Sequence, residues 1–155
     1  MSLKLINHPD FPTNAVDSIL VDPVWLGEGR FRFRYEIRAN VELLSIPKPV
    51  KSACADGLWK TTCVEAFVGA TGNPGYLEMN FSPSTCWAAY LFEDYRGGMK
   101  NLAPAAIPDI ERSRSDGKLE IAVSLDLDGL SMLQAEELEM AVTAVIEEKS
   151  GRKSY

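Results

Sequence analysis

Apolar and polar residues alternate with a period of two over much of the chain, which is typical of β-strands with one buried face. The clearest run is the stretch 31–38, where aromatic or aliphatic residues alternate with charged ones. Similar strand-like runs cover 17–26, 59–69, 76–82, 87–92, 119–125 and 138–146. Gly27-Glu28-Gly29 separates the first two runs and predicts a hairpin turn, because glycine adopts positive φ angles without steric cost.

Helical periodicity is scarce in this sequence. The stretch 128–139 predicts one short helix with Asp128 or Ser131 as its N-cap. The stretch 101–116 is rich in proline, alanine and charge and predicts a long loop. Many short strands separated by turn residues therefore predict an all-β protein, either an antiparallel sandwich or a barrel.

Composition narrows the class of protein further. A length of 155 residues predicts a single domain covering 1–155, and the net charge of −6 argues against nucleic acid and anionic membranes as partners. The longest apolar run, 86–92, is much shorter than the roughly 18 residues that a membrane helix needs. The N-terminus lacks the pattern of a signal peptide, and an odd number of cysteines predicts free thiols in the cytoplasm. One histidine and no CxxC pair predict no metal site, and no motif predicts a cofactor.

One strand combines polar and apolar faces in a way that predicts a binding site. In 76–82, Glu78, Asn80 and Ser82 share one face, while the apolar residues occupy the other. If the turn at Gly72-Asn73 is centred, Glu65 lies opposite Asn80 and Phe67 opposite Glu78. The next strand has a register that is ambiguous by one residue. Its contribution to the face is therefore either Trp87 and Ala89 or Ala88 and Tyr90.

Carboxylates, amides and guanidinium groups bind paired hydroxyls, and a flat indole covers the apolar face of a sugar ring. A few aimed polar groups between aromatic walls suit a small ligand. These residues therefore predict a sugar or polyol site. The alternative is a solvated outer face on which Glu and Asn are merely exposed.

The central block resembles a known family. Its motifs are Leu58-Trp59-Lys60-Thr61-Thr62-Cys63-Val64-Glu65-Ala66-Phe67, Tyr76-Leu77-Glu78-Met79-Asn80-Phe81-Ser82-Pro83-Ser84, Trp87-Ala88-Ala89-Tyr90 and Tyr95-Arg96-Gly97-Gly98-Met99. Together they resemble the DOMON-like family related to family 9 carbohydrate-binding modules, in a bacterial subgroup associated by name with the murein-precursor reductase MurB. These motifs cover about a third of the chain directly.

The resemblance implies an antiparallel β-sandwich that binds a small carbohydrate, without catalysis, on the concave face of one sheet. Trp59 stands at the position of a stacking tryptophan, and Glu65 matches the acidic residue of a Glu-x-Phe strand. Glu78 and Asn80 match the polar pair of the following strand. The expected ligand-binding residues are Trp59, Glu65, Glu78, Asn80, Trp87 and Arg96. The family pattern also leads us to expect a segment containing Trp and His after Tyr155.

Three other functions stay open at this point. Some DOMON relatives bind haem through axial Met and His ligands, but Met79 points away from Glu78 and Asn80, and His8 lies outside the block. A glycan-acting enzyme would use Glu65 and Glu78 as paired carboxylates, although neither shows an apolar pocket that would raise its pKa, and Arg96 nearby is expected to lower it instead.

The third alternative is a protein-interaction scaffold that docks a partner on a sheet face or edge. The last predicted strand, 139–148, has a mixed outer face and charges at its end, at Glu147, Glu148 and Lys149. Charges of this kind oppose edge-to-edge pairing. We therefore expect a monomer or a weak dimer.

Overall fold

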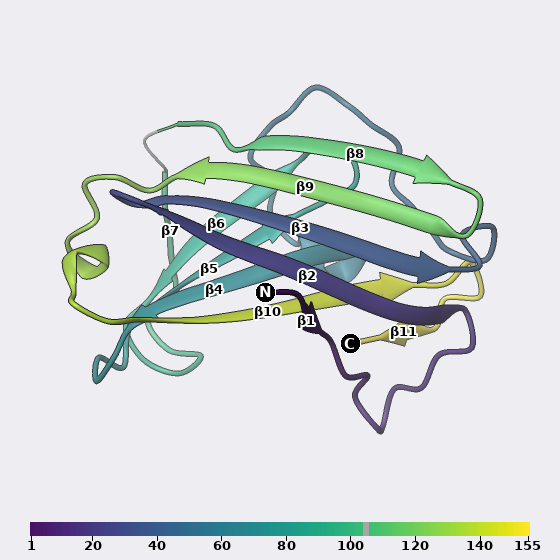
Figure 1. The fold of residues 1–155 in the computed structure, drawn as a ribbon, viewed down its shortest axis with the longest axis horizontal. Helices are drawn as coiled ribbons and strands as arrows, with labels where there is room; N and C mark the ends of the chain where they lie inside the picture. Colours follow the sequence, from purple (N-terminus) through teal and green to yellow (C-terminus); the bar gives the residue numbers. More distant parts are fainter. Residues whose placement is uncertain (104–105) are drawn as a thin grey trace.

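Two antiparallel sheets face each other across an apolar core (Figure 1). The computed structural model describes residues 1–103 and 106–155. The five-stranded sheet has the order β1 (Leu3–Lys4), β2 (Val16–Gly27), β3 (Arg30–Ala39), β9 (Lys118–Asp126), β8 (Asp109–Ser115). The six-stranded sheet has the order β11 (Lys153–Ser154), β10 (Leu138–Glu147), β4 (Cys63–Ala70), β5 (Tyr76–Phe81), β6 (Trp87–Phe92), β7 (Lys100–Asn101). The predicted all-β sandwich is confirmed.

The alternation of the sequence decides which side chains enter the core. On β3, Phe31, Phe33, Tyr35 and Ile37 are all buried, while the arginines between them are exposed. The same period of two buries alternate residues on β9, β4 and β5. Each fully buried large apolar side chain stabilises the fold by about 1.5–3 kcal/mol relative to its exposed state. The core is therefore built mainly from one face of each central strand.

One hydrogen bond joins the two sheets through the core. The hydroxyl of Tyr35 on β3 donates to the backbone carbonyl of Glu65 on β4, with an O···O distance of 2.6 Å. Tyr35 is fully buried, so its hydroxyl needs a partner inside the protein. This bond fixes the spacing between the five-stranded sheet and the strand that carries Glu65.

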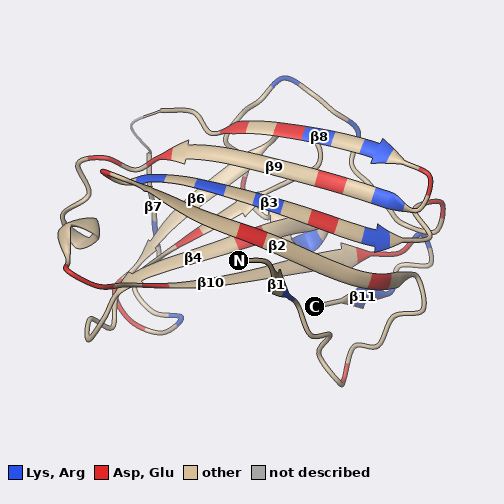
Figure 2. Ribbon diagram, viewed as in Figure 1, with Lys and Arg blue, Asp and Glu red and all other residues tan. Residues whose placement is uncertain are grey.

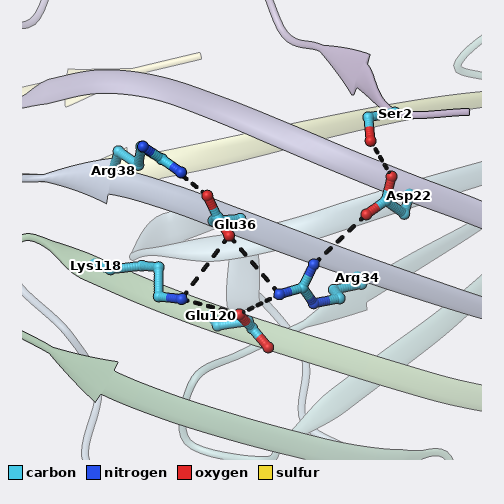
Figure 3. Close-up of polar contacts among 7 residues, drawn as sticks. All are labelled: Ser2, Asp22, Arg34, Glu36, Arg38, Lys118 and Glu120. Carbon is cyan, nitrogen blue, oxygen red and sulfur yellow. Dashed lines mark hydrogen bonds and ion pairs between the residues drawn. The ribbon is translucent and has the colours of Figure 1, made fainter.

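The two sheets differ in the charge of their outer faces. Figure 2 shows both blue and red segments on β3, β8 and β9, whereas β6 is tan. On the five-stranded sheet, Arg34 contacts Glu120 at 2.7 Å and both Glu36 and Asp22 at 3.7 Å (Figure 3). Lys118 joins the same network through Glu36 and Glu120. Each ion pair that solvent reaches contributes little to the free energy of folding. We therefore attribute the charges of this face mainly to favourable contact with water.

Three predictions about local structure differ from what the structure shows. Part of 101–116, predicted to be a long loop, forms strand β8, which pairs with β9 from Asp109 to Ser115. An edge strand faces solvent widely, so its sequence is polar and lacks the alternation of a buried strand. Residues 104–105 of the predicted loop lie outside the described residues.

The predicted helix at 128–139 is a short 3-10 helix, η2 (Ser131–Gln134). The connection has to pass from β9 in one sheet to β10 in the other, and Leu133 inserts into the core on the way. The run predicted as a strand from residue 59 also begins later, at Cys63, because Trp59 lies in the 3-10 helix η1 (Leu58–Lys60). No helix among the described residues is long and apolar enough to span a membrane.

Removing the inter-sheet hydrogen bond should destabilise the sandwich. We expect Tyr35→Phe to lower the free energy of unfolding by about 1–3 kcal/mol, because the substitution leaves the buried Glu65 carbonyl without this donor. Urea unfolding followed by tryptophan fluorescence measures the change. Tyr95→Phe removes an exposed hydroxyl and should stay within about 0.5 kcal/mol of the natural protein. Equal stability of the two variants would contradict a structural role for the Tyr35 bond.

Candidate functional site

The predicted polar row lies on the outer face of the six-stranded sheet. Strand β4 pairs with β5 so that Glu65 lies opposite Asn80 and Phe67 opposite Glu78, which confirms the predicted register. On the next strand, Ala88 lies opposite Asn80 and Tyr90 opposite Glu78. Since paired residues share a sheet face, the open choice between two registers for β6 is resolved in favour of Ala88 and Tyr90.

Trp87 therefore faces the other way. It pairs with Phe81 and packs into the core between the sheets, with 7% of its surface exposed. Its indole N–H has no hydrogen-bond partner among the described residues. The structure brings Glu65, Glu78 and Asn80 together on one face but does not bring Trp87 to them.

The polar side chains of this face are linked by hydrogen bonds. Asn80 is fully buried, and its amide donates to Glu78 Oε1 at 3.0 Å. The hydroxyl of Thr143, which lies opposite Glu65 on β10, donates to Glu65 Oε2 at 2.5 Å. The thiol of Cys63 lies 3.9 Å from both Glu65 Oε1 and Asn80 Oδ1. Both carboxylates are thus held in place by neutral donors.

Burial and mutual repulsion set the electrostatics of the pair. Burial raises the pKa of Glu65, and the negative charge of Glu78 raises it further, while the bonds from Thr143 and Cys63 partly oppose this shift. Burial also raises the pKa of the Cys63 thiol, with further contributions from Glu65 and Glu78. Cys63 therefore stays protonated and serves as a weak donor. Because the carboxyl of Glu65 is costly to ionise here, a donor or cation on a ligand would stabilise its charged form.

An aromatic wall borders the face at one side. Trp59 on η1 contacts Tyr90 edge-on, with ring centroids 5.9 Å apart, and is 36% exposed. The Tyr90 hydroxyl donates to Asp56 at 2.5 Å, and Leu58 packs against the cluster formed by Ala88, Tyr90 and Phe92. These contacts attach the segment 56–60, which carries Trp59, to the outer surface of β6.

A second group of rings lies at the other end of the face. Tyr76 stacks on Phe92 with centroids 4.7 Å apart, and Phe67 lies 6.2 Å from Tyr76. The backbone N–H of Arg96 donates to the Tyr76 hydroxyl at 3.3 Å. The Arg96 guanidinium stacks over Tyr95, 5.3 Å from the ring centroid. A hollow of about 310 Å³ beside the β4–β5 turn is lined by Phe67 and Tyr76, among other residues.

Sequence reasoning missed part of this site. Thr143 was not expected because it comes from β10, which is distant in sequence and pairs with β4 only in the folded protein. Asp56 was not expected either, and only the folded position of Tyr90 shows that the two residues bond. Tyr90 itself belonged to one of the two registers that the sequence left open for β6. No local signal identifies a residue whose importance comes from a neighbour on another segment.

Two other features of the described residues bear on function. A cavity of about 560 Å³ lies elsewhere, between β1–β2 and β10–β11, and is lined by apolar residues such as Val16, Ile19 and Ile146. It contains none of the residues predicted to bind ligand. Met79 is enclosed in the core, whereas His8 stays half-exposed near Asp10, so these two side chains do not fit a pair of axial haem ligands.

The arrangement defines an all-β sandwich with a polar and aromatic patch on the outside of one sheet. No family model matches the chain, and no curated protein matches it. Among solved structures, the fold is similar to that of a candidate carbohydrate-binding protein from Bacteroides uniformis, with a TM-score of 0.64. The two chains are 12% identical, and the match covers 99% of this chain and 74% of the other. At that identity the similarity establishes the sandwich fold.

The raised pKa of Glu65 should appear in the pH dependence of stability. A carboxyl whose folded-state pKa lies above its unfolded value gives stability that is fully present below the unfolded pKa, about 4.3, and is lost as pH rises through the folded pKa. The difference in unfolding free energy between the natural protein and Glu65→Gln should therefore fall as pH rises from about 4 to 7. Urea unfolding at a series of pH values measures this difference.

Glu120 provides a control of opposite sign. The hydrogen bond and charge of Arg34 lower the pKa of Glu120, so its contribution to stability is present above the unfolded pKa and is lost as pH falls. The corresponding difference for Glu120→Gln should rise with pH, by a small amount because solvent reaches this pair. Two parallel slopes would show that the environment assigned to Glu65 is wrong.

Proposed function

We propose that the outer face of β4, β5 and β6 binds a small carbohydrate without catalysis. The observation that carries the proposal is the joint presence of a hydrogen-bonded Glu78–Asn80 pair and the rings of Trp59 and Tyr90 on one sheet face. Sugars present both hydroxyl groups and apolar C–H faces, so they need both kinds of surface. We further propose that the chain is DOMON-like, as its motifs suggest.

In this proposal the polar groups have distinct roles. The carboxylates of Glu65 and Glu78 accept hydrogen bonds from sugar hydroxyls, while Asn80 and Thr143 hold those carboxylates in position. Trp59 is the exposed ring on which the sugar lies. Arg96 stands at the rim through its backbone bond to Tyr76. Trp87 supports the sheet from the core side and does not contact ligand.

The similar fold of the candidate carbohydrate-binding protein from Bacteroides uniformis agrees with this proposal. The match covers 74% of that protein, and the similarity concerns the fold. The face itself offers more acceptors than donors, which favours ligands rich in hydroxyl or amine donors.

A second function is supported by one observation. Burial raises the pKa of Glu65 beside a second carboxylate, and a protonated acid next to a carboxylate is the pair that glycoside hydrolysis requires. Sequence reasoning expected no apolar environment for either carboxylate, and expected Arg96 to lower the pKa. The pKa of Glu65 is instead raised, and Arg96 is not among the groups that change it. We therefore keep a glycan-acting enzyme as the alternative function.

Calorimetric titration with a panel of monosaccharides and disaccharides, including muropeptide fragments, tests the binding proposal. We expect Trp59→Ala to weaken binding of any sugar that binds by about 1–3 kcal/mol, because an exposed ring that contacts ligand is lost. Trp25→Ala is the matched control, since Trp25 is similarly exposed but belongs to β2 in the other sheet. No binding by any sugar, with the protein folded, would refute the proposal, as would equal losses for the two variants.

Incubation with chromogenic glycosides tests the alternative function. An enzyme of this kind should release the chromophore at a rate that Glu78→Gln and Glu65→Gln each reduce by at least about a hundredfold, because each removes one member of the carboxyl pair. Glu111→Gln, on β8 of the other sheet, should leave the rate unchanged. Absence of turnover with sugars that bind would exclude the enzyme and leave the binding function.

A further inference from the structure

The binding face carries negative charge without matching positive charge. This face is bordered by three carboxylates, those of Asp56, Glu65 and Glu78. The hydrogen bonds that they accept come from hydroxyl, amide and thiol groups. The ion pairs of the described residues all lie elsewhere, chiefly on the five-stranded sheet (Figure 3). On the six-stranded sheet Lys100 of β7 pairs with Glu93 just after β6, but Asp56, Glu65 and Glu78 form no ion pair among the described residues.

Two cationic side chains on segments that contact this face, Lys60 and Arg96, do not compensate this charge. The Lys60 side chain folds back on Gly57, with Nζ 3.5 Å from the point that a Cβ would occupy. The Arg96 guanidinium lies over the Tyr95 ring. Neither group comes within 4.0 Å of a carboxylate oxygen among the described residues. The face therefore keeps room for a positive charge supplied by a ligand.

The aromatic rings of the face are an observation independent of the carboxylates that also indicates a ligand there. Aromatic rings flank Glu78, with Phe67 and Tyr90 directly opposite it on the neighbouring strands and Trp59 against Tyr90. Rings and carboxylates together are the surface that attracts an ammonium group.

We infer that the ligand of this face is a cationic sugar, an amino sugar whose primary amine is free and protonated. This inference rests on the proposed carbohydrate-binding function. The ammonium group of this sugar sits between Glu65 and Glu78, and the ring of the sugar lies along Trp59. The charge of the ligand replaces the missing counter-ion, so that Glu65 ionises without the repulsion that Glu78 otherwise causes. A hydroxyl or an acetamido group in the same place would leave the repulsion in force.

Three sugars that differ only at one carbon test the inference. Glucosamine, N-acetylglucosamine and glucose share a ring but present an ammonium, an acetamide and a hydroxyl at that carbon, and the galacto and manno series provide the same comparison with other ring hydroxyls. Titrations followed by NMR at about pH 6, where a primary amine is protonated, give the affinity of each. We expect the amine to bind at least about tenfold more tightly than both neutral partners in the same series.

Salt and charge-neutral variants distinguish the source of that preference. Raising the salt to about 1 M, where the Debye length is about 3 Å, should reduce the preference for the amine several-fold while changing neutral sugars little. Glu78→Gln and, separately, Glu65→Gln keep the side-chain shape and should each reduce the preference. Glu111→Gln on β8 should preserve it. The salt series uses the natural protein, so the test stands if a variant does not fold.

The outcomes separate the inference from the function on which it rests. Tighter binding of the amine, weakened by salt and by either variant, supports the cationic ligand. Equal affinities for the three sugars of every series overturn the inference and leave carbohydrate binding intact. A preference for the amine that salt and both variants leave unchanged also overturns it, because the charge of the face is then not its cause. Failure of every sugar to bind overturns both.

Discussion

The register in which β4 pairs with β5 is the constraint on which the rest of the site depends. With Glu65 opposite Asn80 and Glu78 opposite Phe67, all polar residues of both strands fall on the outer face and all large aliphatic ones fall in the core. A slip of one residue would place carboxylates between the sheets and Met79 outside. Burying an unpaired charge costs far more than a strand pairing returns. The hydrophobic core therefore holds the candidate site in place from behind, and the Tyr35 bond to the Glu65 backbone adds a direct link.

The second element of the site is a connection that has no regular structure of its own. After β3, the chain runs along the open edge of β6, where Ala55 N–H donates to the Trp87 carbonyl and Trp87 N–H donates to the Ala53 carbonyl. It then crosses the outer face, anchored by Leu58 in the small apolar cluster and by the Asp56–Tyr90 bond. Trp59 is thereby held beside Tyr90 by a segment that has hydrogen bonds of its own.

The two outer faces show two ways of handling charge. On the five-stranded sheet, acidic and basic residues of β2, β3 and β9 pair with one another, as Arg34 does with Asp22 and Glu120 (Figure 3). On the six-stranded sheet, the carboxylates are surrounded by rings, an amide, a hydroxyl and a thiol. Solubility explains the first pattern. The second is costly for folding, because burial raises the pKa of Glu65 and opposes its ionisation, and the proposed binding function would account for its presence.

The sequence by itself determined the all-β class, most strand positions and the β4–β5 register, while the choice of a sandwich over a barrel rested on the family resemblance. A period of two is a local property, and the short turn at Gly72-Asn73 leaves one centred pairing. The sequence did not determine that β10 pairs with β4 on its other side, or that 109–115 forms the strand β8. It also left open the direction in which Trp87 points and the path of residues 53–60 across the sheet. Those depend on contacts between segments far apart in the chain. The alanine-rich run of β6 shows the limit, because both of its faces are apolar and only packing against Phe81 on one side and Asp56 on the other selects its orientation.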